Sequence, residues 1–250
     1  MALQKFAVQH PEYDFFYNWE MDIRYTGNYY EFFDKTSRWA RHEPFDPTMR
    51  RSQKYYIPSI HNWTSSDEPE DEEADLIQFG PIFDQIGSQW NFESDVVGYV
   101  NGTDTPRRAV IISASRLSRR LLLKMNHVNA VLRQAVAPEA FPSTVALHYG
   151  MKAIFVPHPI FLDKPWPSRI LSCKKGVLTV GMLDEWFNAI DMFREENMFE
   201  GTSWYFRNHH APDIYFRWRN DEKRRAPDEI CRWPLLLHPI KDVRGVRPTN

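Results

Sequence analysis

The chain has 250 residues, of which 42% are hydrophobic and 15% aromatic, and a formal net charge of -2 at pH 7. This composition is typical of a folded globular protein with a substantial core, and it excludes an intrinsically disordered chain. The balanced charge gives no electrostatic reason to expect binding to nucleic acid or to an anionic membrane. No run of about 18 apolar residues occurs, so the sequence predicts no membrane-spanning helix.

The first part of the chain predicts a helix, a strand and a second helix. Met1–Gln9 has a helical pattern that ends before Pro11, because a proline restricts the residue that precedes it. Tyr13–Arg24 alternates in the manner of a β-strand, and Tyr29–Arg41 has the apolar spacing of an amphipathic helix. Residues 64–75 form an acidic run that we interpret as a solvated surface loop.

The rest of the chain alternates between strand and helix patterns. The predicted strands are Leu76–Phe83, Arg107–Ala114 and Lys152–Val156. The predicted helices are Leu117–Val136 and Pro142–Tyr149, the second of which begins at a proline. Four prolines require Pro157–Pro167 to be extended or turning. The alternation of helices and strands favours the α/β class.

Several motifs that would identify a function are missing. The sequence has no glycine-rich phosphate loop, no serine-nucleophile motif and no HExxH motif. Cys173 and Cys231 are too few for a disulfide framework or a four-thiolate zinc site, and we interpret them as buried thiols, with a single bridge as the alternative. Asn62 and Asn101 begin N-glycosylation patterns, which favour a secretory compartment, although MALQKFAVQHPEYD lacks the features of a signal peptide.

Glu20 and Asp22 are the most informative pair of residues. In a strand, side chains two positions apart point to the same side, so both carboxylates face one space about 7 Å apart. Two negative charges at that distance repel by about 0.6 kcal/mol in water and by about 2–3 kcal/mol at an effective dielectric constant of about 20. In a cleft the pair requires a cation, a proton or the neighbouring Arg24, and Mg²⁺ or Mn²⁺ suits two such carboxylates. On an open surface the same alternation is the polar face of a strand.

Basic side chains form a second candidate group, with the members Arg107, Arg108, Arg116, Arg119, Arg120 and Lys124. Arg116, Arg119 and Arg120 are spaced to share one helix face, and the N-terminal end of that helix is suited to phosphate. A solvated helix face is the alternative interpretation. Binding of nucleic acid by this group is a further hypothesis, which the balanced charge and the lack of interleaved aromatic residues disfavour.

Two further residues are candidates for chemistry. His238 ends an apolar run and precedes Pro239, a placement typical of a strand edge that enters a cleft. No histidine has zinc-ligand spacing to a second histidine or cysteine. Glu139 lies just ahead of the helix that begins at a proline, where it is a candidate catalytic base. Compensation of the helix dipole explains Glu139 equally well.

Six segments occur in order over most of the chain: YDFFYNWEMDIRYTGNYYEFFD, DLIQFGPIF, RRAVIISASRLSRRLLLKMN, FPSTVALHYGMKAIFVPHPIF, GTSWYF and WPLLLHPIK. Together they resemble a fungal protein family of unknown function, number 3405. The first segment is also similar to the stretch of fungal Golgi α-mannosyltransferases in which a Trp-x-x-Glu element follows a run of tyrosines. Those enzymes have the GT-A fold, a mixed α/β sheet with a nucleotide-sugar pocket and usually Mn²⁺.

The resemblance implies a set of roles. Glu20 and Asp22 take the place of the acidic metal-diphosphate motif, and His238 matches the late histidine that many GT-A enzymes add to the shell of the metal. We therefore expect Mn²⁺ or Mg²⁺ as cofactor, a nucleotide-sugar donor, and a glycan or protein acceptor. Arg24 and Arg116 are expected to contact the donor, and Glu139 to act as the base. The resemblance also suggests the Golgi or another secretory membrane compartment.

The sequence departs from the GT-A pattern in one respect. The nucleotide-binding βαβ half of these enzymes precedes the acidic motif, whereas only 13 residues precede Asp14 here. We therefore expect residues 1–250 to be a single, incomplete glycosyltransferase-like domain with a partial mixed sheet. The alternative is a non-catalytic truncated paralogue or a glycan-binding module, because 9 Trp and 11 Tyr residues offer rings that could stack on sugars.

Overall fold

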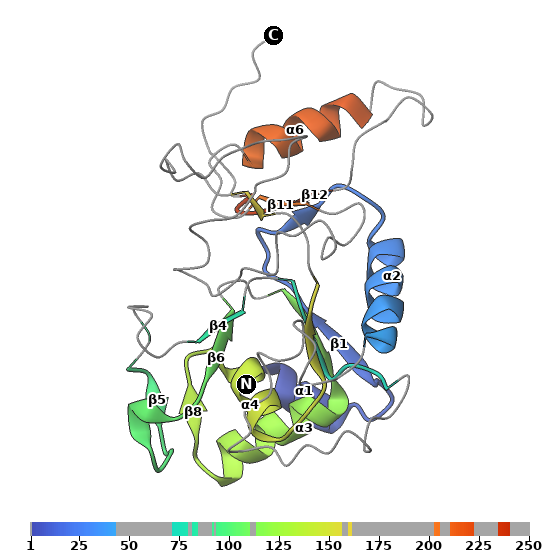
Figure 1. Cartoon of the computed structure of the whole chain (residues 1–250). Coiled ribbons are helices and arrows are strands. Elements are labelled where there is room, and N and C mark those ends of the chain that lie inside the picture. Colours follow the sequence, from blue (N-terminus) through green and yellow to red (C-terminus); the bar gives the residue numbers. More distant parts are fainter. Residues whose placement is uncertain are drawn as a thin grey trace.

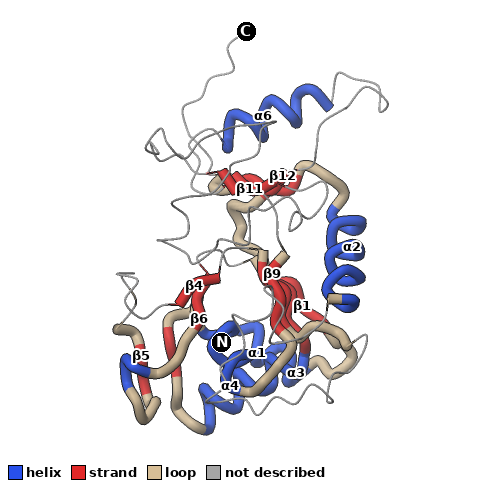
Figure 2. The backbone as a smooth tube through the Cα atoms, in the orientation of Figure 1, coloured by secondary structure: helices blue, strands red, loops and turns tan. Residues whose placement is uncertain are grey.

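Two four-stranded sheets organise the chain, and helices lie beside them (Figure 1). The computed structural model of the protein describes residues 2–43, 72–79, 82–84, 92, 94–110, 114–156, 160–161, 203–205, 211–222 and 235–240. Within these residues the fold is a mixed α/β arrangement with a mixed sheet flanked by helices, as the sequence predicts. Figure 2 separates the helices, the strands and the loops by colour.

The first sheet has the strand order β1-β7-β3-β9. Its strands are β1 (Phe15–Asn18), β7 (Ser115–Ser118), β3 (Leu76–Gln78) and β9 (Ala153–Phe155). β7 is antiparallel to both β1 and β3, whereas β3 and β9 run parallel. The neighbouring residues Leu76 and Ile77 of β3 both have no exposed surface. Because neighbouring side chains of a strand point to opposite faces, both faces of this sheet are covered.

Four helices accompany the first sheet: α1 (Ala2–Gln9), α2 (Tyr29–His42), α3 (Arg119–Asn126) and α4 (Phe141–His148). Figure 1 shows α1, α3 and α4 together on one side of β1 and α2 on the other side. α3 continues into a π-helical turn at His127–Val131. The helices predicted at 1–9, 29–41 and 142–149 and the strand predicted at 152–156 are therefore confirmed.

The second sheet has the strand order β10-β11-β12-β2. Its strands are β10 (Ile160–Phe161), β11 (Ser203–Tyr205), β12 (Leu235–Leu237) and β2 (Arg24–Tyr25), and α6 (Ala211–Glu222) lies beside them. β12 is parallel to β11 and antiparallel to β2. Two-stranded sheets are formed by β4 (Ile82–Asp84) with β6 (Arg108–Val110) and by β5 (Val96–Val97) with β8 (Ala135–Val136). A 3-10 turn lies at Gly102–Asp104.

The helix α2 fixes the segment that joins the two sheets. Asn28 caps α2, because its side-chain oxygen accepts hydrogen bonds from the backbone N–H groups of Tyr30 at 2.9 Å and Glu31 at 3.3 Å. Phe32 of this helix is buried, with its ring 5.2 Å from the ring of Phe79. Trp19, which follows β1, packs edge-on against Phe79 at 5.9 Å. The chain therefore leaves β1 over an aromatic cluster.

Tyr13–Arg24 is not one strand, contrary to the sequence-based prediction. Its first part is β1 in the first sheet, and its last residue begins β2 in the second sheet. The backbone N–H of Ile23 donates to the carbonyl of Glu20 at 3.2 Å and closes a turn between these strands. The chain has to turn here because β1 and β2 pair with partners in different sheets.

Two other predicted elements are divided for similar reasons. Leu76–Phe83 splits into β3 and β4, which pair with different strands. The helix predicted at Leu117–Val136 begins only at Arg119, because Ser118 ends β7 and its hydroxyl accepts a hydrogen bond from the N–H of Leu121 at 3.0 Å. Its last two predicted residues form the strand β8 instead. Predictions for Cys173, Cys231, Asn62, residues 64–71 and most of Pro157–Pro167 lie outside the described residues.

The end of the acidic run is part of the core rather than a solvated loop. Asp75 is 3% exposed and accepts hydrogen bonds from the Ser118 hydroxyl at 2.5 Å and from Nε of Arg120 at 3.0 Å. A second oxygen of Asp75 pairs with Nη2 of Arg120. Hydrogen bonding to Asp75 raises the pKa of Arg120 above its usual value. Asp75 thus joins β3 to the start of α3.

We expect Asp75→Ala to lower the free energy of unfolding by about 2–4 kcal/mol, because it leaves the buried Ser118 hydroxyl without its acceptor and removes two hydrogen bonds from Arg120. Glu72→Ala is the matched control, since Glu72 pairs at 3.1 Å with the same arginine, whose side chain is 58% exposed. That pair should contribute less than about 1 kcal/mol. Urea denaturation of both variants measures the difference. Equal losses would contradict the structural role of Asp75.

Candidate metal centre

Strand pairing in the second sheet brings the two ends of the described chain together. β2 and β12 are antiparallel, with Tyr25 opposite Leu236 and Arg24 opposite Leu237. Asp22 precedes β2 and His238 follows β12, so both residues lie at the same end of this pair. The N–H of Ile240 donates to the carbonyl of Asp22 at 2.7 Å and extends the connection. His238 therefore lies opposite the turn that carries the acids.

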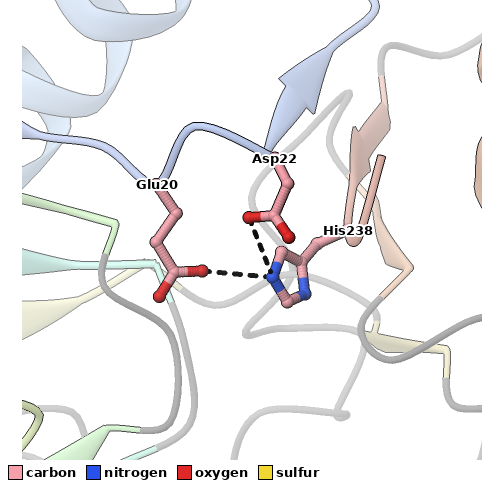
Figure 3. Close-up of side chains that lie close together, drawn as sticks. All are labelled: Glu20, Asp22 and His238. Carbon is pink, nitrogen blue, oxygen red and sulfur yellow. Dashed lines mark ion pairs between the residues drawn. The ribbon is translucent and has the colours of Figure 1, made fainter. Parts of the chain in front are cut away.

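Glu20, Asp22 and His238 point toward one another (Figure 3). Nε2 of His238 lies 3.1 Å from Oε2 of Glu20 and 3.5 Å from Oδ1 of Asp22. One potential ligand atom from each residue lies within 4.8 Å of the others, and no other described residues form such a group. The side chains are 15% exposed for His238, 27% for Asp22 and 29% for Glu20, so solvent reaches the group.

Glu20 and Asp22 face a common space, as the sequence predicts, but through a different geometry. Glu20 and Asp22 do not alternate along one strand face, because they belong to the turn between β1 and β2. The turn places their ligand atoms within 4.8 Å of each other, closer than the separation of about 7 Å along an extended strand. Between them, Met21 is 91% exposed at the tip of the turn. The carboxylates thus converge from a tight turn.

The group has the donor types of a divalent-cation site, and its two distances from His238 are compatible with one. Carboxylate oxygens are ligands that Mg²⁺ and Mn²⁺ prefer, and imidazole nitrogen extends the choice to softer divalent ions. Two ligands that are each about 2.1 Å from a common ion lie at most about 4.2 Å apart. The distances of 3.1 and 3.5 Å from His238 satisfy this limit. Such an ion would leave positions for water or phosphate oxygens and act as a Lewis acid.

The remaining predicted site residues lie outside this group. Arg24 is adjacent, but its Nη1 donates to the backbone carbonyls of Met21 at 2.6 Å and Ile23 at 2.8 Å. Glu139 lies just ahead of α4, and its backbone carbonyl accepts a hydrogen bond from the N–H of Val110 at 3.2 Å. Its side chain is not a member of the ligand group.

Arg116 does not share a helix face with Arg119 and Arg120, since it lies in β7. Its Nη2 donates to Glu73 at 2.9 Å and to the carbonyl of Ala74 at 2.8 Å. Its guanidinium also lies 4.0 Å from the ring centre of Phe15. Since the side chain is 4% exposed and already paired, its contacts are those of a structural residue rather than of a donor-binding one.

A cleft lies at the N-terminal end of α3, where the basic residues suggested a phosphate site. Its lining carries both signs of charge, with the acids Asp14, Glu72, Glu73 and Asp75 and the bases Arg119, Arg120 and Lys124. Asp75 and Glu72 pair with Arg120, and Glu73 pairs with Arg116. The carboxylates repel an added anion, and two of them already pair with Arg120. This cleft therefore does not have the electrostatics of a phosphate site.

Comparison with known proteins places the chain in a family. The family described as "Protein of unknown function (DUF3405)" matches residues 1–69 and 66–242, and the chain belongs to it. No match was found among curated proteins or among solved structures. Among the described residues, none of the helices has both the length and the apolar character needed to cross a bilayer.

If the group binds a cation, Mn²⁺ should raise the thermal unfolding midpoint. Free Mn²⁺ at about 100 times its Kd should stabilise the folded state by about 2.7 kcal/mol. A chelator should reverse the shift, and the variant Glu20→Gln/Asp22→Asn should not show it. Glu12→Gln is the matched control, because Glu12 is not a member of the group. Its carboxylate forms an exposed pair with Nδ1 of His10, at a distance of 2.8 Å. An equal shift in the double variant would contradict binding at this site.

Proposed function

We propose that this chain is a glycosyltransferase-like protein in which Glu20, Asp22 and His238 hold Mn²⁺ or Mg²⁺. These residues would hold the ion against the diphosphate of a nucleotide-sugar donor, and the sugar would pass to a glycan or protein acceptor as the nucleoside diphosphate leaves. The observation that carries the proposal is the convergence of three ligand atoms within 4.8 Å. Oxygen-rich ligands at a partly exposed position suit an ion that also binds phosphate oxygens.

The location of the group in the fold supports the same function. The acids follow β1 in a mixed α/β fold, and His238 follows β12, so the ligands gather beyond the ends of strands. Ligands of open α/β sheets commonly bind in such positions. The resemblance of YDFFYNWEMDIRYTGNYYEFFD to the acidic segment of GT-A enzymes also supports this function, on the sequence alone.

The chemistry required of the site is stabilisation of a departing diphosphate. Negative charge accumulates on the diphosphate as the bond to the sugar breaks, and a divalent cation neutralises that charge. Glu20 and Asp22 would hold the cation by their carboxylates, and His238 by Nε2. The proposal assigns no base, because the structure does not bring Glu139 into the ligand group.

Calorimetric titration with nucleoside diphosphates tests the proposal. In the presence of Mn²⁺, GDP or UDP should bind the wild-type protein, and a chelator should abolish binding. Glu20→Gln/Asp22→Asn should weaken binding by about 100-fold or more, because it removes two ion ligands while keeping the side-chain shapes. The Glu12→Gln control should bind as the wild type does. The proposal fails if neither nucleotide binds, or if the double variant binds with unchanged affinity.

Glycan binding without transfer is a second candidate function, favoured by an exposed aromatic cluster on α1 and the turn after it. Phe6 is 43% and Tyr13 51% exposed, and their rings lie 6.3 Å apart with an angle of 24°. Exposed rings of this kind offer apolar faces to a partner. Binding to immobilised glycans that survives a chelator and is lost in Phe6→Ala/Tyr13→Ala would favour this function. Mn²⁺-dependent release of nucleoside diphosphate from a nucleotide-sugar would favour the first.

A further inference from the structure

The turn that carries the two acids is anchored at Ile23, which has no exposed surface, whereas its tip is exposed. One backbone hydrogen bond, from Ile23 to Glu20 at 3.2 Å, closes the turn. Met21 at the tip is 91% exposed, so its side chain buries little apolar surface that would hold the backbone in place. The direction of the flanking carboxylates of Glu20 and Asp22 therefore depends on what holds the peptide groups of the turn.

Arg24 holds two of these peptide groups. Its Nη1 donates to the carbonyl of Met21 at 2.6 Å and to the carbonyl of Ile23 at 2.8 Å. The two carbonyls belong to the residues on either side of Asp22, so one guanidinium spans the backbone of this ligand. Hydrogen bonds from a cationic donor are about twice as strong as those between neutral groups.

The backbone of Arg24 is also tied to the strand that presents the histidine. Arg24 is opposite Leu237, the residue before His238, in the pairing of β2 with β12. The N–H of Ile240 reaches the carbonyl of Asp22 at 2.7 Å and secures the other side of His238. One residue thus contacts the acid turn through its side chain and the histidine strand through its backbone.

We propose that Arg24 is a positioning residue, whose guanidinium sets the turn so that Glu20 and Asp22 converge on Nε2 of His238. In this role Arg24 determines the affinity for the cation without contacting it. The inference rests on the proposed function, and it replaces the expectation that Arg24 contacts the donor. Its hydrogen bonds go to carbonyl oxygens of its own turn, so the side chain stabilises the backbone of the turn.

The first test is a titration with Mn²⁺ alone, in which electron paramagnetic resonance measures free Mn²⁺. Arg24→Gln should weaken binding about 10-fold, as loss of a residue that orients a metal ligand does. Arg24→Lys should restore part of the affinity, because it keeps the charge and a donor but not the planar fork. Arg38→Gln is the matched control, since it removes an exposed arginine paired with Asp34, and it should bind as the wild type does. Wild-type affinity in Arg24→Gln overturns the inference.

A second titration separates positioning from donor binding. At saturating Mn²⁺, inorganic pyrophosphate should bind Arg24→Gln and the wild type with equal affinity. If Arg24 instead contacts the donor, the variant loses affinity for pyrophosphate and keeps its affinity for Mn²⁺, which overturns the positioning role.

A third measurement uses the metal-free protein, and so it does not depend on the proposed function. A double-mutant cycle compares the thermal unfolding midpoint of the wild type with those of Arg24→Gln, His238→Ala and the double variant. The midpoints also show whether each variant folds. If Arg24 fixes the turn against His238, the shift of the double variant is smaller than the sum of the single shifts. Additive shifts overturn the inference. If the wild type does not bind Mn²⁺ but the shifts are non-additive, the proposed metal site is wrong, whereas the positioning of the turn by Arg24 stands.

Discussion

The candidate site depends on the antiparallel pairing of β2 with β12. β2 has only two residues, and its partner strand lies near the other end of the described chain. This pairing places His238 opposite the acid turn, and the bond from Ile240 to Asp22 extends it. A slip of one residue would move every side chain of the strand to the opposite face, so the register decides whether the imidazole meets the carboxylates.

Local sequence patterns were sufficient to predict two of the helices. The helix at 1–9 follows from its helical pattern and from Pro11 after it, and the helix at 29–41 follows from its apolar spacing. The switch between sheets after β1 was not predictable, because the alternation of YNWEMDIRY continues unchanged through the turn. Period-two alternation predicts which side chains of a strand face the same side. It does not predict with which strands the first and last parts of Tyr13–Arg24 will pair.

The candidate site was predicted in its residues but not in its geometry. Glu20 and Asp22 were conspicuous as a pair, and His238 was conspicuous before a proline. The structural role of Arg116 had no local signal, since its partner Glu73 is distant in the sequence and its burial depends on the packing of Phe15. In the same way, only the fold distinguishes Asp75, which is buried, from Glu72 and Glu73, which are partly exposed.

The ligands of the proposed cation come from opposite ends of the described chain, with consequences for the entropy of assembly. In an unfolded chain, joining the segment of Glu20 to that of His238 would close a very long loop, at an entropic cost that grows with the logarithm of its length. The pairing of β2 with β12 incurs that cost during folding. An ion bound at the proposed site would meet a preorganised set of ligands, and its affinity would be coupled to the cooperative stability of the sheet that assembles them.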